Sequence, residues 1–537
     1  MITQERSVRD EQMRQVMMSN VAANNHAPII EADLEEALEL AGTGRYHVVH
    51  NLVMLATLFA SILEMVGIAF VLPAAACDLD IPDYLKGILT SLPNIGIILT
   101  APFWGRAADS LGRKPVLLGS LIVSGVTAFI AAFMPSLITF ALFKLASSLF
   151  LSCPSSLGYA YVSEMLPRKR RDFAVLVTNG LINLLTVLSP GLAWLILPYD
   201  WVYQFGTIEF RPWRLLTAVY AFPLLLAALC LLVADESPKF LMTKGKDKEA
   251  LAVVRKIYCA NSGLHEDSYC VKSLKIPCDI NDSEQRGSGC ALAPKTKSES
   301  AFALLRPPHL KWFALTGFLM FGLFSFLNGL FLFAPDTINK VMNSNETSGT
   351  VCELMDVSDN STSSEECMDS MSYHTFYIMV VTTIVYGVLV TAGSMSPLSK
   401  KTLLVSMFCV VGVGCLIAGL STNRILAGVA MSSLQLTALG IGPLTAYVVH
   451  LFPTTLRGTA VGAVLMFGRL GSVVGANVAG VSLSAACTLT FYGFAFLYAQ
   501  ASVFSYHQQI KRRSHRKQAQ TADIYIDNFI YFNAILI

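Results

Sequence analysis

The stretch GRAADSLGRKP, from Gly105 to Pro115, places four charged residues between two apolar runs that carry no charge. The run before it reads GILTSLPNIGIILTAPFW, and the run after it reads VLLGSLIVSGVTAFIAAF. Each run is close to the roughly 20 apolar residues that cross a bilayer as one helix. The charged stretch is therefore predicted to be a tight turn between two membrane-spanning helices.

The composition of the whole chain supports this reading. Of its 537 residues, 54% are hydrophobic and only 14% are charged, whereas soluble domains average about 25% charged residues. This excludes a soluble multidomain protein, and the net charge of +2 gives no support for binding nucleic acid. We expect no cleaved signal peptide, because the first 49 residues are polar and ionic.

Runs of membrane-spanning length recur along the chain and predict an all-α polytopic membrane protein with two groups of six helices. The twelve expected spans are His50–Pro73, Gly87–Phe103, Pro115–Phe133, Ile138–Val162, Phe173–Leu197, Leu215–Ala234, Trp312–Pro335, Tyr373–Ala392, Thr402–Leu420, Ile425–Leu451, Thr459–Val478 and Val481–Phe504.

Lysine and arginine in the short loops set the expected orientation. Most of them fall in loops that share one side with both termini, and the positive-inside rule makes that side cytoplasmic. The predicted organisation is a cytoplasmic arm, a six-helix bundle, a cytoplasmic central loop, a second bundle and a cytoplasmic tail. Their ranges are 1–49, 50–234, 235–311, 312–504 and 505–537, with a long outer loop at 336–372.

The long outer loop carries two N-glycosylation sequons, at Asn345 and Asn360. Two sequons in this loop predict a glycoprotein. Cys352 and Cys367 lie in the same loop, and we expect either a disulfide between them or two free thiols.

The two groups of helices repeat each other. Glu164, Pro167 and Arg171 follow the fourth span, and His450, Pro453 and Arg457 follow the tenth span with the same spacing. This indicates a duplicated six-helix unit with both copies in the same orientation. Parallel repeats of this kind place a substrate site near the midplane, between the halves.

Several motifs resemble those of known transporters. Gly105-x3-Asp109-x2-Gly112-Arg113-Lys114 resembles the signature of major facilitator transporters, with Ser110 at a usually basic position. DESPKFLM, FVLPAAACDLDIPDYLKGIL and WLILPYDWVYQFGTIEFRPWR are similar to segments of the synaptic vesicle glycoprotein 2 family and the organic-ion transporters. The resemblance covers about Tyr46 to Phe504 and implies the major facilitator fold.

The charged turn is predicted to act as a conformational latch. Gly105 and Gly112 would let it approach a neighbouring helix closely, and Asp109 would face the positive end of that helix. The resemblance implies that this is the eleventh helix, which starts near Arg457. The cations Arg113 and Arg171 would complete a network with Glu164. The alternative is an ordinary positive-inside turn, and Arg106 and Lys114 fit that description equally well.

Three charged residues lie within the expected spans: Glu64, Lys144 and Arg469. Each charge costs about 2.5–3.5 kcal/mol at the centre of an inserted helix, so each should face a cavity or a partner. Glu64 would carry a proton or pair with a cation. The family pattern pairs this glutamate with an aspartate, and Ser61 stands at that position here.

The two cations have alternative readings. Arg469 would bind an anionic group of a substrate, serve as counter-ion to Glu64, or support close helix packing at Gly468 and Gly471. Lys144 would take part in the site or extend its amine to the membrane interface. Among uncharged polar residues, Asn328 is a further candidate for substrate contact.

Two functions are compatible with these features. The first is a secondary transporter of a small organic, ionic or neutral solute, coupled to a proton, another cation or the solute gradient itself. The second is a synaptic-vesicle-type glycoprotein of the plasma or vesicle membrane that acts through protein partners. The sequence has no catalytic triad, metal-binding cluster or nucleotide-binding motif, so we expect no enzyme activity, metal or cofactor.

Overall fold

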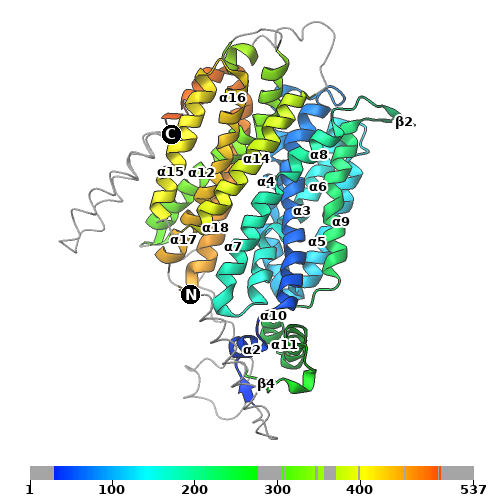
Figure 1. The fold of residues 1–537 in the computed structure, drawn as a ribbon, viewed down its shortest axis with the longest axis vertical. Coiled ribbons are helices and arrows are strands. Elements are labelled where there is room, and N and C mark those ends of the chain that lie inside the picture. The colour runs from blue at the N-terminus through cyan, green and yellow to red at the C-terminus, as the bar shows by residue number, and fades with distance from the viewer. Residues whose placement is uncertain are drawn as a thin grey trace, which may run out of the picture. The chain divides into compact units, whose positions relative to one another are not determined.

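The computed structural model describes residues 30–206, 208–275, 304–307, 309–344, 349–355, 371–396, 400–452, 454–493 and 495–496. These residues form two compact units (Figure 1). The small unit contains the described residues of Met1–Leu52, Tyr161–Asp172 and Asp235–Pro294, and the membrane unit contains the rest. Asn345, Asn360 and Cys367 lie outside the described residues.

The membrane unit is helical, as the apolar runs predict. Eleven helices within the described residues are long and apolar enough to cross a membrane. The twelfth expected span, Val481–Phe504, lies partly outside the described residues. The helices of the first half are α3 (Arg45–Ala75), α4 (Asp83–Leu111), α5 (Arg113–Ala131), α6 (Leu137–Glu164), α7 (Arg168–Leu185), α8 (Leu188–Ile196) and α9 (Pro212–Leu231).

The second half contains one helix that is broken. Its elements are α12 (His309–Asn343), α14 (Tyr373–Met395), α15 (Lys400–Leu420), α16 (Arg424–Ser432), the 3₁₀ helix η4 (Ser433–Gly440), α17 (Ile441–Leu451) and α18 (Thr454–Ala485). The tenth span was expected to be continuous, but η4 divides it. Helix α12 also continues past Pro335 into the predicted outer loop, because Thr337, Ile338 and Val341 remain buried.

Close packing of α12 against α18 organises the second half. A Cβ added at Gly471 would overlap the backbone carbonyl of Phe321, and one added at Gly475 would overlap that of Ser325. The Ser325 hydroxyl also donates to the Gly471 carbonyl at 2.9 Å. Small residues let two membrane helices approach at backbone distance, so the close approach suggested by Gly471 is present.

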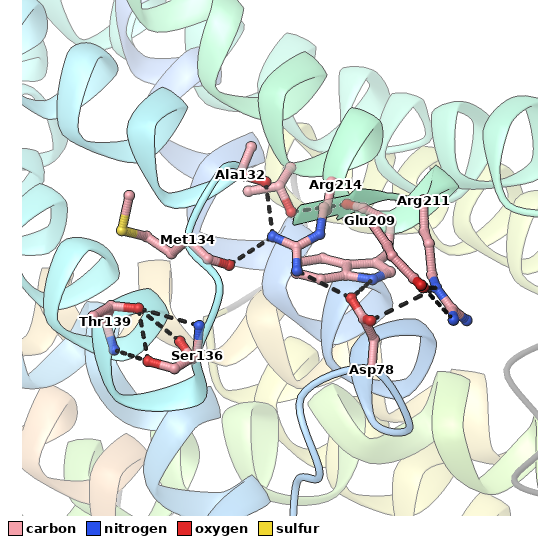
Figure 2. Close-up of polar contacts among 10 residues, drawn as sticks. Asp78, Ala132, Met134, Ser136, Thr139, Glu209, Arg211 and Arg214 are labelled. Carbon is pink, nitrogen blue, oxygen red and sulfur yellow. Dashed lines mark hydrogen bonds and ion pairs between the residues drawn. The ribbon is translucent and has the colours of Figure 1, made fainter. Parts of the chain in front are cut away.

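Salt bridges and hydrogen bonds fasten one end of the first half, where three loops meet (Figure 2). Arg214, at the start of α9, donates to the carbonyl of Met134 at 2.6 Å and to Asp78 at 3.1 Å. The indole of Trp213 donates to the same carboxylate at 3.0 Å, and Arg211 lies 3.6 Å from it. Arg214 therefore ties the α3–α4 and α5–α6 loops to α9. A two-stranded antiparallel hairpin, β2 (Tyr203–Phe205) and β3 (Ile208–Phe210), precedes α9.

The small unit has its own core. Strand β1 (Ile30–Ala32) pairs in parallel with β4 (Val271–Leu274), and α2 (Leu34–Ala41) packs with α11 (Asp247–Ser262). The stretch DKEALAVVRKI is amphipathic: it forms most of α11 and buries Ala250, Leu251, Val254 and Ile257. Two short helical elements complete the unit: α10 (Pro238–Thr243) and η1 (Glu266–Ser268).

Hydrogen bonds within the small unit join its sequence-distant segments. The Asn261 side chain accepts from the Tyr46 amide at 3.1 Å and donates to the Gly42 carbonyl at 2.9 Å. Asp235 accepts from the Tyr46 hydroxyl and the Lys256 amine, both at 2.8 Å. The described residues of the N-terminal arm and those of 235–275 in the central loop thus belong to one folded unit.

The expected disulfide between Cys352 and Cys367 is wrong. Cys352 instead bonds to Cys487, with Cα atoms 5.6 Å apart and a sequence separation of 135. The prediction paired Cys352 with Cys367 because both lie in the same expected loop, and closeness along the chain was the evidence that the sequence offered. In the fold, residues 351–355 form a helical turn beside the segment that follows α18.

Peptide mapping under non-reducing conditions should recover Cys352 joined to Cys487. We expect Cys487→Ser to lower the free energy of unfolding by about 2–4 kcal/mol, as is typical when a long loop loses its cross-link. A Cys352–Cys367 peptide from the native protein would contradict this assignment.

Candidate functional site

Glu64 and Lys144 form a buried ion pair inside the first half. Glu64 lies on α3 and Lys144 on α6, and the amine is 2.5 Å from Glu64 Oε1. Only 4% of the Glu64 side chain and 5% of the Lys144 side chain are exposed. Glu64 Oε2 is buried with no hydrogen-bond partner. The pair thus retains one carboxylate oxygen that can accept a proton or a donor group.

This pairing overturns two expectations from the sequence. Glu64 was considered as a partner of Arg469, and the structure gives it Lys144 instead. Lys144 was considered able to extend to the membrane interface, and its amine points into the bundle. The physical reason is that an unpaired buried charge is far more costly than a paired one, and α6 brings a cation directly to Glu64.

Arg469, on α18, contacts both halves of the membrane unit. Its guanidinium donates to Asn94 Oδ1 on α4 at 3.0 Å and contacts Met65 Sδ on α3 at 3.5 Å. It also lies 5.5 Å from the ring centre of Phe324 on α12. Within the described part of the chain, no carboxylate lies within ion-pair distance of Arg469. Its contacts within the described residues are neutral groups, and none of them compensates its positive charge.

Asn328 was expected to contact substrate, and the structure gives it a packing contact. Its amide donates to the Ser472 hydroxyl at 2.5 Å, between α12 and α18. This bond lies on the same interface as Gly471 and satisfies one donor of the amide. A role for Asn328 in substrate contact therefore stays a prediction.

The charged turn between α4 and α5 is solvent-exposed at its acidic residue. Asp109 is 75% exposed and pairs with Arg113, one turn later, at 3.0 Å. Arg113 also donates to the Ala108 carbonyl at 2.8 Å, and Lys114 donates to the Leu232 carbonyl at 2.9 Å. Gly112 has a φ of 111°, which a residue with a side chain rarely adopts. The second glycine of the motif is thus required by the turn itself.

Asp109 pairs within its own turn, and its role as a latch stays a prediction. A Cβ added at Gly105 would meet no atom within 4 Å, so the close approach expected there is absent. Arg171 binds Glu35 at 2.6 Å, within the small unit. Glu164 belongs to the same small unit and is buried. The side chain of Arg457 lies outside the described residues.

A pocket between the halves is lined by apolar side chains. Phe70 of α3 and Pro190 of α8 contribute to it from the first half, and Phe331 of α12 and Met379 of α14 contribute from the second half. A neighbouring pocket is bordered by Lys86 of α4 and Asp336 of α12, which form an ion pair at 3.7 Å. Sequence reasoning missed this ion pair because charged residues near span ends are common, and it missed Asn94 because uncharged polar residues within spans are common.

These features define a polytopic α-helical membrane protein with two helical halves and ionised groups buried in its core. The chain belongs to the major facilitator superfamily: the family model described as "Major Facilitator Superfamily" matches residues 53–476. The resemblance that the sequence motifs predict is confirmed at this level, and so is the predicted fold class.

Curated relatives include synaptic vesicle glycoproteins. Synaptic vesicle glycoprotein 2C of Rattus norvegicus is 31% identical over 263 residues, which cover 47% of this chain and 36% of that protein. Synaptic vesicle glycoprotein 2A of Homo sapiens is 33% identical over 231 residues, which cover 42% and 31%. The chain thus matches about a third of the length of these relatives.

Solved structures share the fold at low sequence identity. A partially occluded inward open conformation of the xylose transporter XylE from E. coli superposes with a TM-score of 0.59 at 15% identity, over 86% of this chain and 99% of that chain. A mutant form of the nucleoside transporter NupG gives a TM-score of 0.55 at 14% identity, over 86% and 100%.

Proposed function

We propose that this protein is a secondary transporter that moves a small organic anion across a membrane by alternating access. The observation that carries the proposal is Arg469, a guanidinium at the boundary of the two halves whose described partners are neutral. A cation in a low-dielectric environment needs a counter-charge. An anionic substrate would supply that charge each time it binds.

The ion pair of Glu64 and Lys144 is proposed as the coupling site. Its two charges cancel, so the pair adds no net charge for the substrate to overcome. A proton bound to the free oxygen of Glu64 would weaken the attraction to Lys144 and release the contact between α3 and α6. Uptake of a proton would in this way change how two helices of the first half are held.

We further propose that both termini are cytoplasmic, as the distribution of lysine and arginine indicates. The Asp83 end of α4 then faces the outside, and the Leu111 end faces the cytoplasm. With this orientation the structure corresponds to a state that is closed outside. Asp109 would act as a latch in the opposite state, facing the start of α18 near Arg457, with Arg113, Glu164 and Arg171 nearby.

Uptake into proteoliposomes tests the proposal. Purified protein should accumulate at least one labelled mono- or dicarboxylate from a small panel when the lumen is alkaline. We expect Glu64→Gln to abolish the dependence on the pH gradient, and Arg469→Gln to reduce uptake of anions by about 10–100-fold, the loss that accompanies a charge-assisted hydrogen bond.

A matched control is Arg424→Gln, which removes a guanidinium at the start of α16 that bonds only to the Ser344 carbonyl among described groups. Uptake by this variant should equal that of the parent. Uptake of cations or sugars that is insensitive to Arg469→Gln would contradict an anion site. Silence across the panel from folded protein would favour a glycoprotein that acts through partners in the plasma or a vesicle membrane.

A further inference from the structure

One face of α4 packs against α18 in the part of the helix that begins at Asp83. A Cβ added at Gly87 would lie 2.9 Å from the Ala476 carbonyl oxygen and from the Asn477 Cα. One turn later, the Ser91 hydroxyl lies 3.5 Å from the Asn477 amide. A further turn along, Asn94 accepts from Arg469. These three residues of α4 share one helical face.

At the other ends of the same helices, the glycines face open space. A Cβ added at Gly105 on α4 would meet no atom within 4 Å, and the same holds for Gly458 and Gly462 on α18. The ion pair between Lys86 and Asp336 lies at the closed end, with side chains 13% and 20% exposed. The contact of α4 with α18 described above thus includes the part that begins at Asp83, and Asn94 is the innermost of the three α4 residues named above.

Asn94 and an anionic substrate would compete for the same guanidinium. The Asn94 side chain is buried, with 2% exposed, and its amide oxygen is a neutral acceptor. An ionised oxygen makes a hydrogen bond roughly twice as strong with a guanidinium. An arriving carboxylate therefore outcompetes Asn94 for Arg469, and the innermost contact between α4 and α18 is lost.

We infer that Asn94 is a positioning residue that occupies Arg469 when no substrate is bound and links substrate binding to the opening of the α4–α18 contact. The anion in this inference rests on the proposed function, whereas the link between Asn94 and the contact rests on the geometry alone. When Asn94 no longer binds Arg469, α4 is still held to α18 by Ser91 and by the packing at Gly87. The Lys86–Asp336 ion pair also holds α4 to α12.

Thiol labelling at position 91 tests the inference without a substrate. Ser91 is fully buried in the closed contact, so a cysteine placed there by Ser91→Cys reacts only when α4 and α18 separate. The full-length protein is treated with a charged methanethiosulfonate, and modification of residue 91 is followed by peptide mass spectrometry. The native cysteines do not interfere, because the readout is specific to one peptide.

Asn94→Asp supplies Arg469 with a permanent carboxylate of the same shape. We expect labelling about tenfold slower than in the Ser91→Cys parent, which corresponds to the extra strength of an ionised acceptor. Asn94→Leu removes the acceptor and should label faster than the parent. Adding Arg469→Gln to Asn94→Asp should remove the slowing, because the new carboxylate then has no guanidinium to bind.

Asn183→Asp is the matched control, because the Asn183 amide bonds to the Asn179 carbonyl of its own helix. It should label at the parent rate. Parent-like labelling of both Asn94→Asp and Asn94→Leu would overturn the inference, even if anion uptake were normal. The expected labelling pattern without uptake of any anion would support the role of Asn94 and count against the proposed transport.

Discussion

Lys144→Met should strongly destabilise the protein. The substitution preserves the length and much of the volume of the side chain but removes the cation 2.5 Å from Glu64. The carboxylate would then be buried among neutral groups, with one oxygen already lacking a partner. Breaking a buried ion pair from one side costs about 3–5 kcal/mol. We expect a clear drop in the apparent melting temperature, measured by intrinsic fluorescence of protein in detergent.

The double variant Lys144→Met/Glu64→Gln distinguishes the loss of the pair from a simple packing defect. It removes both charges together, and replacing a buried pair by neutral groups is often nearly neutral. Its melting temperature should return close to that of the parent. A double variant as unstable as Lys144→Met alone would show that the shape of Lys144, rather than its charge, stabilises the bundle.

The double variant also separates stability from transport. If the pair serves only to hold α3 and α6 together, restoring stability should restore uptake. If it is the coupling site, the double variant should be folded and still fail to respond to a pH gradient. Measuring both properties on the same preparation decides between these roles.

Much of the fold follows from the sequence because the membrane imposes a simple rule. A run of about 20 apolar residues has to become a helix to satisfy its backbone groups, and this located the spans. The rule averages over whole runs, so it could not detect the 3₁₀ segment η4 within Ile425–Leu451. Nor could it detect the pairing of β1 with β4, because strands of three and four residues carry almost no local signal.

The candidate site was only partly predictable for a related reason. Glu64, Lys144 and Arg469 were identifiable because a charge inside a span is rare and costly. Their partners depend on how each helix is rotated about its axis, and α3 is apolar on nearly every side. The sequence therefore could not show that Glu64 faces Lys144. Asn94 was missed because uncharged polar residues in spans usually bond within the bundle.

The conformation accounts for the remaining difference at the charged turn. The contact proposed for the motif from Gly105 to Lys114 would belong to another state of the proposed transport cycle, and in this structure Gly105 on α4 and Gly458 on α18 face open space. Gly112 is needed in every state, because its positive φ forms the turn. The motif thus contains two kinds of residue. Gly112 fixes the local geometry of the turn, and Asp109 is proposed to act only after the two halves have changed their relative orientation.

Gly471→Val should prevent α12 and α18 from packing. Even a Cβ at this position would overlap the backbone carbonyl of Phe321, and a backbone cannot move aside as a side chain can. The helices would have to separate along their length and lose the bond from Ser325 to the Gly471 carbonyl. Overpacking costs about 1–3 kcal/mol in ordinary cores, occasionally more, and we expect the upper end here. The measurement is the yield of monodisperse protein by size-exclusion chromatography, followed by its melting temperature.

Gly462→Val, on the same helix, is the matched control. A Cβ at Gly462 would meet no atom within 4 Å, so the same change in side chain and helix propensity should leave yield and melting temperature near those of the parent. The contrast isolates close packing from the general effect of replacing glycine with a β-branched residue. Equal behaviour of the two variants would mean that α12 and α18 do not approach at backbone distance, and the arrangement that holds Arg469 toward Asn94 would then lose its support.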